Sequence, residues 1–242
     1  MLACEDVHFS FGRGQEVLRG VTWSSVPGQV TAILGPNGSG KTTLLRLLLG
    51  ILEPTQGRVH MRGRATHHIP TPDMARSISY VPQRGGSEFG FTVRQVLELG
   101  IQRAQSPETV SLIQRVATDL SVTELLDRVA NELSEGQRQR VTLARAIIQI
   151  ESSPLQATEK TLLADEPFSA MDPRQERQSM KVLGELSKKG YCVVVVMHDL
   201  RATRRLATQA VLLEELGRVK ASGEIEAVLT PENIEAVFGI VE

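Results

Sequence analysis

The strongest constraint on the fold is an apolar run that ends at a glycine-rich stretch and is followed by a helical pattern. Residues 30–34 read Val-Thr-Ala-Ile-Leu, a short apolar run typical of a buried central strand. Gly35 and Pro36 end this run, and leucines at 44, 45, 47 and 48 predict a helix that begins near Lys41. A strand, a glycine loop and a helix in this order predict an α/β fold.

The glycine-rich stretch matches the pattern Gly-x-x-x-x-Gly-Lys-[Ser/Thr] in full. It consists of Gly35, Pro36, Asn37, Gly38, Ser39, Gly40, Lys41 and Thr42, with Thr43 next to it. Glycines let successive backbone N–H groups turn inward, and the helix that follows directs its positive end toward the same point. We therefore expect the loop to hold the phosphates of ATP, with Lys41 at the β and γ phosphates and Thr42 on Mg²⁺. The alternative is a turn that fits by chance, and the flanking strand and helix disfavour it.

A second apolar run, 161–164, ends in Asp165 and Glu166. A strand that delivers a carboxylate at its C-terminal end can place a metal-binding Asp beside a phosphate loop. We expect Asp165 to be a second Mg²⁺ ligand and Glu166 to polarise the attacking water as general base. Strands often end in a solvated acid, so this pattern gains its weight from the loop upstream.

Composition and charge narrow the class of partner. The 242 residues carry 27 Lys and Arg against 28 Asp and Glu, a net charge of -1, which gives no indication of the basic face of a nucleic-acid binder. The most apolar run, 191–197, is far too short to span a bilayer, and no secretory signal is evident at the N-terminus. Cys4 and Cys192 lie at opposite ends of the chain and fit reduced thiols of a cytosolic protein.

A third motif identifies the class of ATPase. Leu133-Ser134-Glu135-Gly136-Gln137, followed by a predicted helix over 138–148, resembles the signature of the ABC ATPase family, usually Leu-Ser-Gly-Gly-Gln. Ser134 is placed as an N-cap, so its hydroxyl, the Gly136 N–H and the helix dipole can meet an anion. The resemblance implies that Ser134, Gly136 and Gln137 contact the ATP held by a second copy of the chain. Glu135 departs from the usual Gly, and a carboxylate beside phosphate is repulsive unless it turns away.

Further positions follow the order of the ABC ATPase family. Gln83 resembles the loop glutamine that meets Mg²⁺ and water, and His198 the switch histidine that contacts the γ-phosphate. Asp172 lies in 169–172, which is similar to the loop that communicates between the two ATP sites. Phe11 resembles the aromatic residue that stacks on adenine, where Tyr is more usual. Each of these residues alone would suggest an ordinary surface or core position. The support for the family resemblance comes from their occurrence together in the family's order.

The resemblance covers nearly the whole chain and implies one nucleotide-binding domain with a P-loop NTPase core. We expect 1–91 and 159–242 to form the α/β core with an N-terminal antiparallel β subdomain. We expect 92–158, where apolar residues recur at helical spacing, to form an inserted helical subdomain and the signature helix. Further strands are predicted at 17–26, 57–61, 77–81, 191–197, 211–213 and 218–220, and a helix at 173–188.

The resemblance also implies an activity and a set of partners. Two copies of the chain would close on two ATP molecules, with Lys41, Gln83, Glu166 and His198 as the catalytic set. The expected partners are transmembrane permease subunits and, indirectly, a periplasmic or surface substrate-binding protein, with no nucleic acid. The expected location is peripheral, at the cytoplasmic face of the inner membrane.

Three stretches, 74–77, 91–100 and 228–239, are similar to the ATPases of importers for iron chelates, haem and cobalamin. The polar insertion 151–158 resembles one in haem-import subunits, and an incidental surface loop explains it equally well. An exporter ATPase and a soluble ABC ATPase outside transport stay open as alternatives. A P-loop kinase or GTPase would lack the signature and His198.

Two groups of residues outside these motifs have simpler interpretations. His67 and His68, with His60 nearby, lie on a polar connector and are expected to be solvated rather than metal-binding. Phe89 and Phe91 follow the Gln83 loop and could receive a helix of the membrane subunit or belong to the helical core. The sequence does not separate these two roles.

Overall fold

The computed structural model describes residues 2–12, 14–83, 90–102 and 106–239, and its architecture is mixed α/β with two sheets. The larger sheet has the order β10-β9-β3-β8-β7-β6. Its parallel strands are β3 (Val30–Leu34), β6 (Ile78–Val81), β7 (Thr161–Asp165), β8 (Cys192–Val196) and β9 (Gln209–Leu213), and β10 (Val219–Glu224) runs antiparallel at one edge. Strands β3, β7 and β8 are buried along their whole length, as expected for a parallel sheet covered on both faces.

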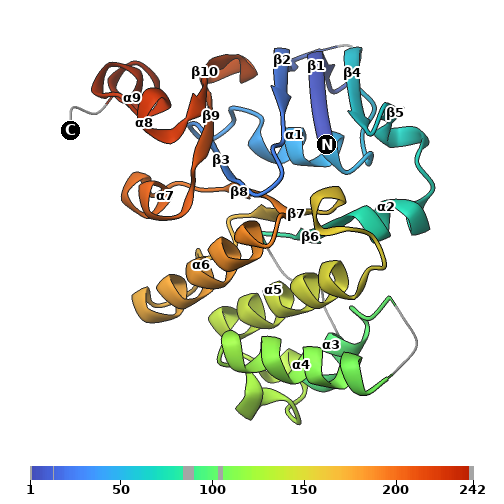
Figure 1. The fold of residues 1–242 in the computed structure, drawn as a ribbon. Coiled ribbons are helices and arrows are strands. Elements are labelled where there is room, and N and C mark those ends of the chain that lie inside the picture. The colour runs from blue at the N-terminus through green and yellow to red at the C-terminus, as the bar shows by residue number, and fades with distance from the viewer. Residues whose placement is uncertain (1, 13, 84–89, 103–105, 240–242) are drawn as a thin grey trace.

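The smaller sheet is antiparallel and has the order β2-β1-β4-β5. It consists of β1 (Leu2–Ser10), β2 (Glu16–Ser24), β4 (Gln56–Met61) and β5 (Arg64–Ala65). Figure 1 shows this sheet beside α1, on the far side of the larger sheet from α4. The two sheets together confirm the predicted α/β class with an antiparallel β unit.

The helices divide between the sheet and a separate helical group. Around the sheets lie α1 (Lys41–Leu48), α2 (Thr71–Ser77), α6 (Pro173–Lys188), α7 (Leu200–Leu206), α8 (Ile225–Val228) and α9 (Pro231–Phe238). Between β6 and β7 in the chain come α3 (Val93–Glu98), α4 (Pro107–Asp119) and α5 (Glu135–Ser152), of which α3 and α4 lie farthest from the sheets in Figure 1. Short 3₁₀ turns cover Thr66–His68, Thr123–Leu125, Ala130–Glu132, Ala157–Glu159 and Glu215–Gly217.

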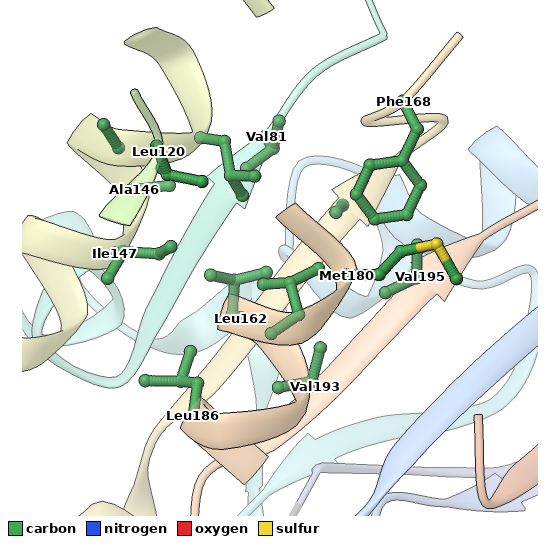
Figure 2. Close-up of a cluster of buried hydrophobic side chains, with 14 of the residues drawn as sticks. Val81, Leu120, Ala146, Ile147, Leu162, Phe168, Met180, Leu186, Val193 and Val195 are labelled. Atoms are coloured by element: carbon green, nitrogen blue, oxygen red, sulfur yellow. The ribbon is translucent and has the colours of Figure 1, made fainter. Parts of the chain in front are cut away.

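Side chains along the central strands point alternately to the two faces of the larger sheet, and each face packs into its own hydrophobic cluster. Leu162, Val193 and Val195 point into the cluster formed with α5 and α6, which Figure 2 shows in close-up. Leu163 and Val194, their chain neighbours, pack instead against α1 and the antiparallel sheet. This two-sided burial fixes the register of the strands and therefore the position of the residues that follow them.

Most predicted elements are found, with shifted bounds. The strand over 30–34 and the helix over 173–188 match to the residue, while the predicted helix over 138–148 extends to Glu135–Ser152 as α5. The strand predicted at 77–81 begins one residue later because Ser77 ends α2. The insertion 151–158 is only partly irregular, since α5 continues through Ser152. The residue bounds of the predicted subdomains stay a prediction.

Strand β1 escaped prediction as a separate element because its polar residues and bulges break the two-residue alternation. The register to β2 shifts three times, and Asp6 has a positive φ of 47°.

Among the described helices, none combines the length and the apolar character needed to cross a membrane.

Leu162→Ala should lower the free energy of unfolding by about 2–5 kcal/mol, because it opens a cavity between the sheet and α6. Urea denaturation followed by far-UV circular dichroism measures this. Val110→Ala is the control, since Val110 is 63% exposed on α4 and should change stability by less than about 0.5 kcal/mol. Equal losses in the two variants would contradict this assignment of the core.

Candidate nucleotide site

The glycine-rich loop lies between the end of β3 and the first turn of α1, as the sequence predicts. Gly35 has a φ of 150°, and a Cβ there would lie 2.5 Å from the Leu213 carbonyl oxygen, so only glycine fits. Gly40 is the N-cap residue of α1, and the first backbone N–H groups of any helix lack intrahelical partners. The loop therefore presents N–H groups and the positive end of α1 at one place.

Lys41 is almost completely buried at the start of α1. Its Nζ donates to the carbonyl oxygens of Gly35 at 2.8 Å and Pro36 at 2.9 Å, which holds the ammonium over the loop. Burial lowers the pKa of Lys41, and the nearby charges of Glu166 and Asp165 oppose this shift. The loop thus has a cation at its centre that is only partly compensated.

Asp165, at the C-terminal end of β7, is 2% exposed and contacts the first turn of α1. Its Oδ2 accepts a hydrogen bond from the Thr42 hydroxyl at 2.9 Å, and its Oδ1 is buried with no partner among the described residues. Burial is the main cause of a raised pKa for Asp165, and the charge of Glu166 adds to it. A carboxylate with an unsatisfied oxygen beside a hydroxyl is the oxygen-rich environment that Mg²⁺ prefers, so these residues fit the predicted metal site.

Glu166 has a positive φ of 49°, a conformation unusual for a residue with a side chain. Its carboxylate meets two side chains from the ends of neighbouring strands. Gln83 donates from Nε2 to Oε2 at 2.8 Å, and His198 Nε2 lies 2.5 Å from Oε1. Because β6, β7 and β8 are parallel neighbours, residues that are far apart in sequence meet at one edge of the sheet.

A cavity of about 370 Å³ joins these parts. It is lined by Val17, Asn37, Gly38, Gly40, Lys41, Thr42, Thr43, Gln83 and Glu166. The structure therefore brings both halves of the predicted site together, from the glycine loop to the acidic strand end. A second cavity of about 270 Å³ adjoins it at Glu166 and includes His198 and Ser169.

Other predicted residues lie outside the larger cavity. Phe11 follows β1, is 53% exposed and stands edge-on to Phe9, with ring centroids 4.8 Å apart. Ser134 is the N-cap of α5, and its hydroxyl accepts from the Gln137 N–H at 3.3 Å while Gln137 Oε1 accepts from the Ser134 N–H at 3.0 Å. Asp172 caps α6 by accepting from the N–H groups of Arg174 and Gln175, each at 2.9 Å. Nucleotide contact by these residues stays a prediction.

Two residues of this region were missed from the sequence. Val17 lines the cavity, and nothing in its sequence context distinguishes it from an ordinary strand residue. Gln139 is 5% exposed and contacts Glu166, although it looks in the sequence like one more polar residue of an exposed helix. Its burial is a consequence of packing between α5 and the 166–170 turn.

The histidines of the polar connector pair with each other and with nearby carboxylates. The rings of His67 and His68 are in contact with their planes tilted by 55° and their centroids 4.1 Å apart. His67 lies 3.3 Å from Glu53, and His60 lies 2.8 Å from Glu5. Within the described part of the chain, no group of three or more His, Cys, Asp or Glu residues could hold a metal.

The two phenylalanines after the Gln83 loop are described only in part. Phe91 is 44% exposed, so its ring is not part of the helical core. Phe89 lies outside the described residues. A role of these rings in receiving a membrane subunit stays a prediction.

Comparison with known proteins places this geometry in a family. The model of the ABC transporter family matches residues 18–169. The hemin import ATP-binding protein HmuV of Rhizobium meliloti (strain 1021) is 38% identical over 229 residues, which cover 93% of this chain and 87% of that protein. HmuV of Pseudomonas entomophila (strain L48) is 36% identical over 242 residues, which cover 99% of this chain and 93% of that protein.

Solved structures agree on the fold. An ATP-binding subunit of an ABC transporter superposes with a TM-score of 0.84 at 23% identity, covering 100% of this chain and 95% of that one. A metal-chelate type ABC transporter in an inward-facing conformation superposes with a TM-score of 0.78 at 29% identity. The match covers 99% of this chain and 89% of that one. The predicted P-loop NTPase architecture of the ABC ATPase type is confirmed.

Asp165→Asn should raise the free energy of unfolding of the nucleotide-free protein at neutral pH by on the order of 1 kcal/mol, because it removes a buried charge whose Oδ1 has no partner among the described residues. The folded-state pKa of Asp165 is raised, so the carboxyl contributes most to stability when protonated and loses that contribution as pH rises. The gain should therefore shrink toward about pH 4, near the ordinary pKa of Asp. Thermal unfolding at both pH values checks this.

Asp73→Asn is the matched control, because Asp73 is an exposed carboxylate paired with Arg76 in the same helix. It should change stability little at either pH. If Asp165→Asn destabilised the protein at neutral pH, the ionised carboxylate would be a net stabilising group, contrary to the prediction.

Proposed function

Since the chain belongs to the ABC transporter family as an ATP-binding subunit, we propose that it uses ATP hydrolysis to energise import of hemin or a related iron chelate through a membrane permease. The observation that carries the catalytic part is the single cavity lined by Lys41, Thr42, Gln83 and Glu166. The observation that supports the cargo is the similarity to hemin import proteins over nearly the whole chain.

Lys41 and the loop bind the triphosphate. The ammonium now held by the Gly35 and Pro36 carbonyls exchanges part of that contact for β and γ phosphate oxygens, which supply the negative charge that the loop lacks. Phe11, half exposed at the end of β1, offers its ring face to adenine. Thr43 and the N–H groups of residues 37–40 complete the cradle.

Thr42, Asp165 and Gln83 would hold Mg²⁺, which when bound neutralises developing charge on the phosphates. The Oδ1 atom of Asp165 and the Thr42 hydroxyl would supply oxygen ligands to the ion. Gln83 would contribute its side-chain oxygen, because its Nε2 already donates to Glu166.

Glu166 acts as the general base. Its carboxylate, oriented by Gln83 and His198, accepts a proton from the water that attacks the γ-phosphorus. His198 changes partner as ATP enters and donates toward the γ-phosphate, which releases one carboxylate oxygen for the water. Hydrolysis yields ADP and phosphate.

A second copy of the chain completes each site. Ser134, Gly136 and Gln137 lie outside the cavity that holds the catalytic set, at the positive end of α5. This arrangement supports an ATP-sandwich homodimer in which the capped turn of one subunit covers the ATP of the other. Asp172, at the end of the 169–172 loop, caps α6, and in this proposal it lies at the contact between the two subunits.

The transport partners follow from the proposal. The chain would bind transmembrane permease subunits from the cytoplasmic face of the inner membrane as a peripheral protein, with a periplasmic or surface substrate-binding protein delivering cargo from the other side. The 151–158 insertion, near Leu155, lies against Arg62 and Arg76, away from the nucleotide cavity. Any role of this insertion in transport would therefore come from contact with a partner protein and not from contact with the nucleotide. An exporter or a soluble ABC ATPase is the competing function.

Glu166→Gln should lower the rate of ATP hydrolysis by about 100-fold or more, because the base is lost while ATP binding is kept. The variant should also form an ATP-dependent dimer, detected by size-exclusion chromatography with light scattering. Lys41→Ala is the control and should bind ATP poorly and remain monomeric. Hydrolysis at the unmodified rate in Glu166→Gln would rule out Glu166 as the base.

The cargo is tested with the chain assembled on its permease in liposomes. A substrate-binding protein loaded with hemin should stimulate ATP hydrolysis several-fold, and the same protein without cargo should not. Stimulation only by a siderophore-loaded binding protein would replace hemin with another iron chelate, and stimulation only by a cobalamin-loaded one would overturn the iron-chelate assignment. Either result would leave the ATPase assignment intact.

A further inference from the structure

Gln139 is a buried amide in the second turn of α5, three residues beyond Gly136 and therefore on the same face of the helix. That face lies against the turn that follows Glu166. The contact is close, since a Cβ on Gly136 would lie 2.4 Å from the Ala170 carbonyl oxygen. The capped turn of α5 and the 166–170 turn therefore form one tightly packed unit.

The Gln139 side chain satisfies three partners in this turn at once. Its Nε2 donates to the Glu166 carbonyl oxygen at 3.1 Å and to the Ser169 hydroxyl at 2.8 Å, and its Oε1 accepts from the Ala170 N–H at 3.0 Å. The backbone partners fix the orientation of the amide, because a carbonyl can only accept and an N–H can only donate. A side chain with donors alone or acceptors alone cannot replace it.

The first of these partners is the residue whose backbone is strained. Glu166 has its positive φ of 49° between two hydrogen bonds, with its N–H donating to the Val196 carbonyl at 3.2 Å and its carbonyl accepting from Gln139. Strained backbone persists where its surroundings determine it. Gln139 is thus the contact through which α5 helps to hold the backbone that directs the Glu166 carboxylate toward Gln83 and His198.

We propose that Gln139 is a positioning residue that couples the Ser134–Gln137 turn of α5 to Glu166 and the 169–172 loop of the same subunit. When that turn closes on the ATP of the partner subunit, a displacement of α5 is transmitted through Gln139 to the base in its own site. This makes hydrolysis in one site depend on occupation of the other. The inference rests on the proposed function and adds a residue that links the two sites.

The test compares Gln139→Met with Gln149→Met. Both are buried or half-buried amides of α5, and Gln149 donates to the carbonyl oxygens of Ala75 at 3.0 Å and Ile78 at 3.3 Å, away from the nucleotide cavity. Methionine keeps the length of glutamine and removes its hydrogen bonds. Both variants should lose unfolding stability to a similar degree, so Gln149→Met controls for helix packing.

In Gln139→Met, kcat should fall about 10- to 100-fold, as expected when a catalytic group shifts by an ångström. The Hill coefficient for ATP should fall toward one, while the dissociation constant for ATP of the monomer should stay within about twofold, since Gln139 lies outside the cavity. Gln149→Met should keep the unmodified kcat and Hill coefficient. Gln139→Glu, which keeps only acceptors, should behave like Gln139→Met.

Three outcomes would overturn the proposal. These are an unchanged kcat and Hill coefficient in Gln139→Met, equal losses in the two methionine variants, and a weakened ATP affinity with kcat preserved. If Gln139→Met does not fold, Ser169→Ala removes one of the three bonds and should lower kcat and the Hill coefficient in the same direction. An unmodified chain that neither hydrolyses ATP nor dimerises with it would instead refute the proposed function.

Discussion

The hydrogen bond from the Thr42 hydroxyl to Asp165 is the interaction on which the site depends. It joins the first turn of α1 to the end of β7, two segments 123 residues apart in the chain, at 2.9 Å. It forms because β3, β8 and β7 are parallel neighbours, so their C-terminal ends lie at one edge of the sheet. The same edge places Gln83 after β6 and His198 after β8.

A consequence of this arrangement is that the site contains buried charges and a buried oxygen atom that lack full compensation within the described structure. Lys41 and Asp165 are buried, their pKa values are displaced in the directions that disfavour charge, and Asp165 has an oxygen without a partner in the described structure. A bound phosphate and a divalent cation would supply the missing charges and ligands. Burial thus leaves charges and an oxygen atom in this site that a bound nucleotide and cation would satisfy.

Helix α5 connects the hydrophobic core to the turn that follows Glu166. Its middle contributes Ala146 and Ile147 to the hydrophobic cluster on one face of the larger sheet (Figure 2), which holds the helix in place. Its first turns carry Ser134 as cap and Gln139 as the contact to Glu166. A helix anchored in a core and ending at a surface suits the proposed transmission of a displacement from a second copy of the chain to Glu166.

The sequence by itself determined the α/β class, the central strand 30–34, helix 173–188 and the glycine loop, because periodicity, glycine placement and apolar runs are local properties. It also predicted which residues meet in the cavity, from Lys41 to Glu166. Only the tertiary structure placed Val17 in the lining, joined His198 to Glu166 and buried Gln139 against the 166–170 turn. These contacts arise between distant segments, and a local pattern has no information on which backbone will pack against a given side chain.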